Sequence, residues 1–73
     1  MQINDILREL REDNDKTQTE IAEILKTSQG YYSKYELGKR EIPTHHIKTL
    51  CLYYGVSADY ILGLPKNLKY PER

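Results

Sequence analysis

The side chains best suited to chemistry gather between residues 28 and 40, and what they offer is hydrogen bonding and positive charge. If a helix begins after Ser28, the helical repeat divides this segment into two faces. One face is polar or open: Gln29, Gly30, Ser33 and Lys34. The other is aromatic and acidic: Tyr32, Tyr35 and Glu36. A helix that enters the major groove of DNA while packing on a core requires such a pair of faces.

The polar face predicts contacts with base edges. The Gln29 amide can bond adenine N6 and N7 together, and the alternative is a glutamine in solvent. Lys34 reaches either guanine O6 and N7 or a phosphate, and the two contacts are equally favoured. Ser33 touches a base or the DNA backbone, with a solvated serine as the equal alternative. Gly30 makes no side-chain contact but lets the helix backbone approach the groove closely.

A second group of residues predicts contacts with DNA phosphates, which set affinity and docking register rather than sequence preference. Ser28, Lys39 and Arg40 flank the predicted helix and belong to this group. Tyr31 lies at the edge of the polar face. There it either bonds a phosphate or stacks on a sugar, and a half-buried tyrosine is the competing interpretation.

The charge of the whole chain is zero, whereas a DNA-binding domain usually has a basic footprint. The distribution along the chain changes this picture. Residues 26–48 carry five basic and two acidic side chains, a local net charge of +3, and residues 1–25 carry a net charge of −4. On charge alone, a chance distribution explains the pattern equally well.

Two helices are predicted before the polar segment. The first runs from about Asn4 to Asp13, and Asn14 is expected to end it in left-handed backbone. Thr17 then caps a second helix, and Glu20 three residues later completes a capping box. The apolar positions of the two helices are Ile3, Ile6, Leu7, Leu10, Ile21, Ala22, Ile24 and Leu25.

Three further helices are each predicted between a cap and a glycine stop, and no strand pattern appears. The caps and stops are Ser28 and Gly38, Thr44 and Gly55, and Ser57 and Gly63. A loop that ends at Pro43 separates the third helix from the fourth. The apolar stripe of the fourth helix is Ile47, Leu50, Cys51 and Tyr54.

Short motifs follow one another in a fixed order along these helices. They are Thr17-Gln18, Ile21-Ala22, Ser28-Gln29, Tyr35-Glu36-x-Gly38-Lys39-Arg40-x-x-Pro43 and Gly55-Val56-Ser57-x-Asp59-x-Ile61-Leu62. In this order and spacing, residues 4–64 resemble the Cro/cI-type (XRE family) helix-turn-helix regulators of phages and bacteria. The resemblance implies an all-α, five-helix, lambda-repressor-like DNA-binding domain whose helix-turn-helix is formed by helices 2 and 3.

The resemblance also implies roles for individual residues. Gln29 matches a position that reads a base edge, and Gln18 matches a glutamine that contacts a phosphate and braces the first residue of the recognition helix. Arg11 and Glu36 match an ion pair between helices 1 and 3, with two separate exposed charges as the alternative.

Two residues depart from the family pattern. Lys26 stands in the turn where glycine is usual, and a non-glycine residue with positive φ costs on the order of 1 kcal/mol. Gly30 stands where many relatives carry a base-reading side chain.

The chain divides into a helix-turn-helix domain over 1–64 and a C-terminal tail over 65–73. A palindromic operator read by a homodimer is expected, because such domains pair across two half-sites. The tail and the region of helix 5 carry apolar residues that suit a dimer contact: Tyr53, Val56, Tyr60, Leu62, Leu64, Leu68 and Tyr70. Alternatively, Leu68 and Tyr70 fold back over their own core.

Other chemistry has little support in the sequence. Cys51 lies on an apolar stripe and is expected in the core, while His45 and His46 are expected at the surface. No catalytic group, metal site, cofactor or small-molecule ligand is indicated. No apolar run spans a membrane and no signal peptide is visible, so a cytoplasmic protein is expected.

We therefore expect a sequence-specific regulator of transcription, a repressor, that binds double-stranded DNA by inserting helix 3 (about 29–37) into the major groove. An enzyme is not expected. The alternative function is a helix-turn-helix antitoxin or anti-repressor that acts mainly through a protein partner.

Overall fold

The helices begin and end where local hydrogen bonds to the backbone are available. The structure is a computed structural model that describes residues 2–69 and 71. This part of the chain forms five α-helices and no strand: α1 (Ile3–Asp13), α2 (Gln18–Leu25), α3 (Gln29–Glu36), α4 (Thr44–Tyr54) and α5 (Ala58–Leu62). The all-α, five-helix prediction is confirmed.

Side-chain caps define the starts of α2, α3 and α5. The Glu20 N–H donates to Thr17 Oγ1 at 3.1 Å, and the Thr17 N–H donates to Glu20 Oε1 at 3.0 Å, so the predicted capping box is present. Ser28 Oγ accepts the Tyr31 N–H, and Ser57 Oγ accepts the Tyr60 N–H.

Two predicted helix boundaries are wrong in detail. Asn14 follows α1 with φ −99°, outside the left-handed region, and its side-chain amide donates to the Leu10 carbonyl at 2.7 Å. The left-handed residue is Asp15, at φ 55°. Thr44 does not cap α4, because it is already the first helical residue. Pro43, with φ −62° and ψ 150°, holds the N-cap position instead.

The core lies where the five helices meet. α2 packs against α3, α1 packs against both α3 and α5, and α4 packs against α5 and α2. The side chains buried most completely come from all five helices: Leu7, Ile21, Tyr32, Leu50 and Ile61. Cys51 is partly buried against this core, as its place on the apolar stripe predicts. One shared core therefore fixes α2 and α3 relative to the rest of the domain.

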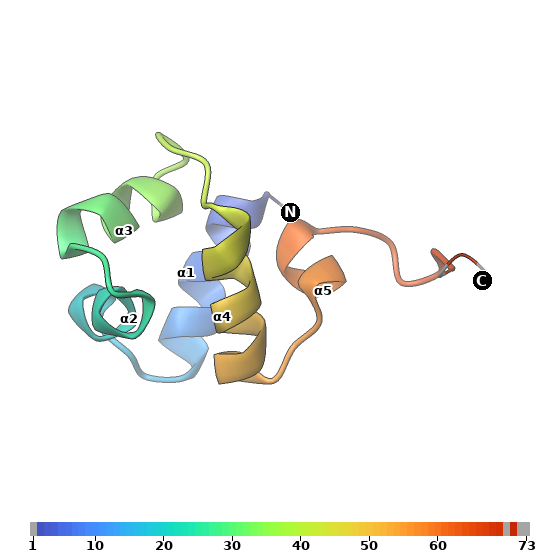
Figure 1. The fold of residues 1–73 in the computed structure, drawn as a ribbon, viewed down its shortest axis with the longest axis horizontal. Coiled ribbons are helices and arrows are strands. Elements are labelled where there is room, and N and C mark those ends of the chain that lie inside the picture. The colour runs from blue at the N-terminus through green and yellow to red at the C-terminus, as the bar shows by residue number, and fades with distance from the viewer. Residues whose placement is uncertain (1, 70, 72–73) are drawn as a thin grey trace.

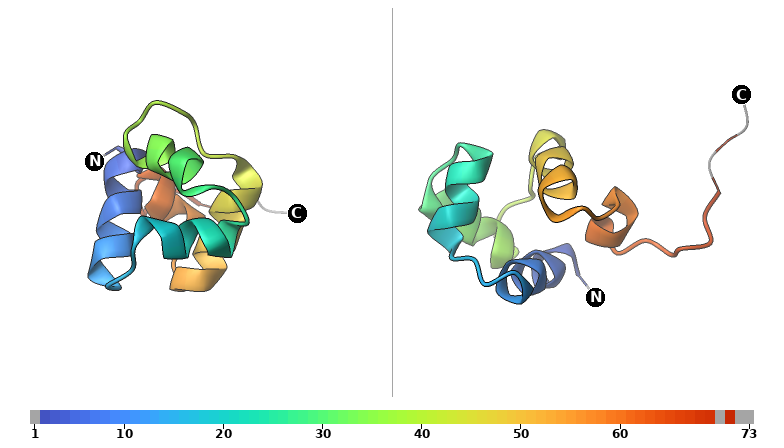
Figure 2. Two further views of the ribbon diagram at one scale, coloured as in Figure 1. Left: turned by 90° about the vertical axis from the view of Figure 1, so that its left-hand side faces the viewer. Right: turned by 90° about the horizontal axis from the view of Figure 1, so that it is seen from below.

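The arrangement of helices separates two ends of the molecule. Figure 1 shows α2 and α3 at one end, α1 and α4 in the middle, and α5 with the tail at the other end. Figure 2 shows the α2–α3 end face-on and the tail extending away from the helices. The described residues extend 40 Å along the longest axis and 22 and 21 Å across it.

Candidate nucleic-acid interface

The two faces predicted for α3 are confirmed. Tyr32, Tyr35 and Glu36 are buried. Gln29, Gly30 and Lys34 are exposed and Ser33 is half-buried. A Cβ added at Gly30 would lie 4.0 Å from Ser28 Oγ, so this position is open toward solvent. The helix thus presents a continuous polar surface while its aromatic side holds it on the core.

The turn that leads into α3 depends on a left-handed residue. Lys26 ends α2 with φ 58° and ψ 41°, and the Thr27 N–H donates to the Ala22 carbonyl at 2.9 Å. This is the position where glycine would relieve strain, as predicted from the sequence. The turn places the start of α3 beside the start of α2. As a result, the Gln29 and Gln18 side chains are hydrogen-bonded to each other.

A chain of hydrogen bonds orients the Gln29 amide. Gln29 Nε2 donates to Gln18 Oε1 at 2.6 Å, and Gln18 Nε2 donates to Glu36 Oε1 at 3.1 Å. One Nε2 hydrogen and the Oε1 lone pairs of Gln29 remain for a ligand. These are the donor and acceptor that adenine N7 and N6 require. The expected brace between Gln18 and Gln29 is therefore present, and it is itself fixed by Glu36.

Glu36 receives its main support from α1. Arg11 Nε donates to Glu36 Oε2 at 2.7 Å and Arg11 Nη2 donates to Oε1 at 2.9 Å. Arg11 Nη1 also donates to the Lys16 carbonyl at 3.0 Å. The side chains are 14% and 3% exposed, so the ion pair is largely removed from water. The expected pairing of Arg11 with Glu36 is confirmed, and the alternative of two exposed charges is wrong.

The electrostatics around Arg11 and Glu36 favour the charged forms of both side chains. Burial alone would raise the pKa of Glu36, but hydrogen bonds from Arg11 and Gln18 outweigh it and hold that pKa below its ordinary value. The hydrogen bond to Glu36 raises the pKa of Arg11. The hydroxyl of Tyr54 is buried in the same region without a hydrogen-bond partner, and burial raises its pKa to about 12.

The predicted phosphate-contacting residues surround the polar face. Ser28 and Tyr31 lie at the start of α3, and Gln18 lies at the start of α2. Lys39 and Arg40 are exposed on the exit loop, which we define as residues 37–43. The Ser28 hydroxyl oxygen accepts the Tyr31 N–H, and its hydrogen is the donor that a phosphate could use. Contact of these residues with DNA stays a prediction.

The sequence did not anticipate the burial of His46. His46 is buried and its ring lies 6.1 Å from that of Tyr35 on α3, whereas His45 is exposed as expected. Burial, with a smaller effect of His45, lowers the pKa of His46. The prediction of two surface histidines is wrong for His46, because its ring lies against that of Tyr35 on α3. Helical spacing within α4 carries no signal of that contact.

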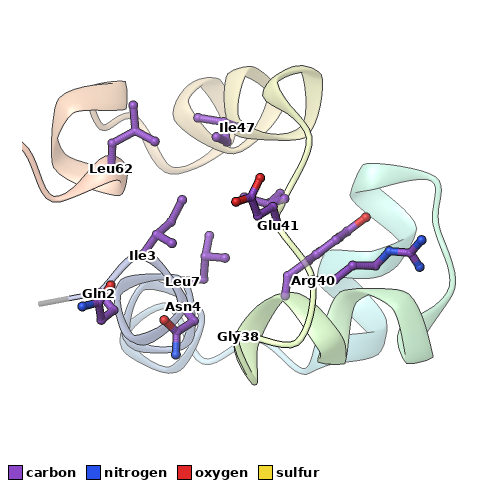
Figure 3. A pocket seen from close by; sticks show the side chains of 11 residues that line it. Gln2, Ile3, Asn4, Leu7, Gly38, Arg40, Glu41, Ile47 and Leu62 are labelled. Carbon is purple, nitrogen blue, oxygen red and sulfur yellow. The ribbon is translucent and has the colours of Figure 1, made fainter.

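A cavity of about 400 Å³, open to solvent, lies between the exit loop and the start of α1. Ile3 and Leu7 of α1, Ile47 of α4 and Leu62 of α5 form its apolar wall, and Glu41 lies at its edge (Figure 3). In the part of the chain that the structure describes, no cluster of three metal-ligating side chains occurs. No helix there is long and apolar enough to cross a membrane.

Five helices with an exposed, braced α3 define a helix-turn-helix domain. Residues 5–66 match the helix-turn-helix domain family, and the chain belongs to this family. An uncharacterized HTH-type transcriptional regulator, YobD of Bacillus subtilis (strain 168), is 36% identical over 58 residues, which are 80% of this chain and 52% of YobD. The chain thus spans about half the length of this curated relative.

Two solved structures share the fold. A transcriptional regulator from Listeria innocua superposes with a TM-score of 0.84 at 20% identity, covering 96% of this chain and 65% of the other. The clp gene regulator ClgR from C. glutamicum superposes with a TM-score of 0.72 at 32% identity, covering 82% of this chain and 78% of ClgR. The first likeness concerns the fold alone, because the identity is low.

Proposed function

We propose that this protein regulates transcription, as a repressor, by binding double-stranded DNA with α3 in the major groove. The observation that carries the proposal is the fixed Gln29 amide, which is exposed, bonded to Gln18 and left with one donor and one acceptor for a base. A pre-oriented amide discriminates between bases better than a mobile one, because little side-chain freedom is lost on binding. Membership of the helix-turn-helix family supports the same function.

Base recognition is assigned to Gln29, Gly30 and Ser33, and direct phosphate contact to Gln18, Ser28, Lys39 and Arg40. Lys34, for which a base edge and a phosphate are equally favoured by the sequence, is assigned to a phosphate, and Tyr31 supports phosphate contact by holding neighbouring side chains and not through its hydroxyl. Gln18 has two roles in this scheme. Its Oε1 and one Nε2 hydrogen are engaged inside the protein, and the start of α2, where backbone N–H groups lack helical partners, favours a phosphate beside it. Repression would follow from occupancy of the operator, with no bond made or broken.

We propose that the functional unit is a homodimer on a palindromic operator. The supporting observation is apolar surface around α5 and the start of the tail, at Tyr53, Tyr60, Leu62, Leu64 and Leu68, all of which are exposed. Val56 contributes less than expected because it is partly packed on the core. Leu68 is 58% exposed, and Tyr70 lies outside the described residues.

Duplex titration tests the proposed function. The protein should bind random-sequence duplex at low salt, and log K should fall linearly with log salt concentration. Sites selected from a random duplex pool should contain a palindrome with a fixed half-site spacing. Leu64→Ser should weaken binding to the palindrome more than to a single half-site. Absence of any duplex binding at low salt would contradict the proposal.

A second candidate function rests on a separate observation. Leu52 on α4 is 86% exposed, an unusual position for a large apolar side chain, and Tyr53 beside it is also exposed. A helix-turn-helix antitoxin or anti-repressor would cover such a surface with a protein partner. A protein that ignores duplex at low salt but binds a partner through Leu52, so that Leu52→Ser abolishes the complex, would support this alternative.

A further inference from the structure

Tyr31 is the aromatic centre of a small cationic cluster on the exposed side of α3. The ring centroid lies 5.4 Å from Lys34 Nζ and 5.1 Å from Arg40 Cζ. Both distances fall within the range of about 6 Å in which a cation is attracted to the face of an aromatic ring. Tyr31 is 46% exposed, so the cluster faces solvent. We call these three residues the Tyr31 cluster.

Within the described part of the chain, both cations lie over the Tyr31 ring without an acidic partner. Among residues 2–69 and 71, neither Lys34 nor Arg40 forms an ion pair. The negative charge of the ring faces attracts each cation and keeps both like charges within one small region. Contact with a ring leaves the N–H donors of both side chains available for an oxyanion. Such an arrangement is suited to receiving a negative charge.

The Tyr31 cluster brings a side chain of the exit loop together with a side chain of α3. Lys34 is on α3 itself, one turn after Tyr31, whereas Arg40 comes from the exit loop. Figure 3 shows the Arg40 side chain directed away from the cavity, toward the helix-turn-helix. The loop reverses at Gly38, where φ is 73°, and is anchored at its far end by buried Ile42. The Lys39 N–H donates to the Lys34 carbonyl at 3.0 Å, which ties the loop to α3 just before Arg40, and the contact with Tyr31 then holds the Arg40 side chain beside α3.

We propose that Tyr31 is a positioning residue, which holds Lys34 and Arg40 together so that one DNA phosphate meets both cations. This inference rests on the proposed function, which it deepens by assigning the role of the aromatic ring. The ring acts through its π face, and its hydroxyl makes no essential contact. Because two flexible side chains are ordered before binding, less conformational freedom is lost when the phosphate arrives.

A double-mutant cycle on random-sequence duplex tests the proposal. Tyr31→Leu should weaken binding about 2- to 5-fold, the equivalent of ~0.5–1 kcal/mol for an exposed cation–π contact. In an Arg40→Ala background the same substitution should have a clearly smaller effect. Tyr31→Phe, which keeps the ring, should bind like the wild type. Lys39→Ala is the matched control, because the cations over the Tyr31 ring in the described part of the chain are Lys34 and Arg40, so its effect and that of Tyr31→Leu should be additive.

Two results of the cycle would overturn the proposal. In one, Tyr31→Phe binds as weakly as Tyr31→Leu, which would assign the effect to the hydroxyl. In the other, Tyr31→Leu and Arg40→Ala are fully additive, which would leave Tyr31 without a positioning role. Equal thermal unfolding midpoints of the Tyr31 variants ensure that the comparison concerns binding and not folding.

A measurement on the free protein separates this proposal from the proposed function. In NMR spectra, the methylene protons of Lys34 and Arg40 near the charged groups should be shifted upfield by the ring current of Tyr31. The shift should persist in Tyr31→Phe and disappear in Tyr31→Leu. Absence of the shift in the wild type would overturn the cluster. A shift without any duplex binding would instead contradict the proposed function and leave the cluster itself established.

Discussion

Arg11 of α1 donates two hydrogen bonds to the two carboxylate oxygens of Glu36 in α3, through Nε at 2.7 Å and Nη2 at 2.9 Å. The Glu36 carboxylate also accepts from Gln18, which in turn accepts from Gln29. A single buried carboxylate therefore connects α1, α2 and the exposed end of α3. Stability and the orientation of the candidate base-reading residue depend on the same group.

Arg11→Ala should destabilise the domain by about 3 kcal/mol, because it leaves the Glu36 charge buried without its partner. Urea unfolding followed by circular dichroism would measure this loss. Arg8→Ala is the matched control on the same helix. Its partner Asp5 lies 3.5 Å away and both side chains are well exposed, at 49% and 38%, so it should cost no more than about 1 kcal/mol. Equal losses for the two variants would contradict a buried, stabilising role for Arg11.

Acid should destabilise the wild type more steeply than Glu36→Gln. The pKa of Glu36 is held below its ordinary value of 4.5 in the folded state, so the unfolded chain binds the proton more readily. The stabilisation by the ionised carboxylate is fully present above about pH 4.5 and is lost as the pH falls through the lowered folded pKa. Urea midpoints measured from pH 7 to acid would show this difference.

Glu20 is a second carboxylate with a lowered pKa, so its contribution to acid sensitivity must be distinguished from that of Glu36. Hydrogen bonds from the Thr17 N–H and hydroxyl lower the pKa of Glu20 as well. Glu20→Gln therefore serves as the control, and it should leave the additional acid sensitivity from Glu36 in place. Parallel stability curves for the wild type and Glu36→Gln in acid would rule out the predicted role of Glu36.

Replacing a base-reading residue should change sequence preference, whereas replacing a phosphate-binding residue should change affinity for every sequence. Gln29→Ala should cost about 1–3 kcal/mol on the selected operator and much less on random duplex, since it removes a bidentate base contact. Lys34→Ala should weaken binding to the operator and to random duplex alike, because the Tyr31 cluster places Lys34 on a phosphate. Lys39→Ala should weaken binding to every sequence and reduce the salt slope by about one. An unchanged salt slope for Lys39→Ala would remove it from the phosphate-contacting group.

Lys26→Gly should stabilise the domain by about 0.5–1 kcal/mol. A left-handed residue with a side chain costs roughly 1–2 kcal/mol, and the greater freedom of glycine in the unfolded chain offsets about half of this. Lys26 has φ 58°. Gly55→Ala is the opposite test, since Gly55 has φ 69° and no neighbouring atom within 4 Å of an added Cβ. It should destabilise by a similar amount. Thermal unfolding of both variants measures the cost of left-handed backbone without steric clashes.

Most of the secondary structure was predictable because its signals act over short distances. The capping box of Thr17 and Glu20, the cap at Ser28 and the glycine stops are interactions between residues at most five positions apart. In both places where the prediction failed, the residue next to the predicted one occupies the position instead. Asp15 took the left-handed position in place of Asn14, and Pro43 took the cap position in place of Thr44.

The candidate site was predictable to a smaller extent. The polar face of α3 follows from the helical repeat alone, and the structure confirms it. The contact of Arg11 with Glu36, and that of Gln18 with Gln29, were expected only from the resemblance to a family. The bond between Gln18 and Glu36, which joins the two contacts into one network, and the burial of His46 were not expected at all.

The sequence by itself determined which segments are helical and which face of α3 is polar, because these depend on hydrogen bonds and periodicity within a few residues. Only the tertiary structure decided how that face is presented. Glu36 meets a guanidinium 25 residues away and an amide 18 residues away, and Gln29 meets an amide 11 residues away. Such contacts form when helices pack on a common core, and no local pattern encodes the packing. The orientation of the Gln29 amide is accordingly a property of the fold.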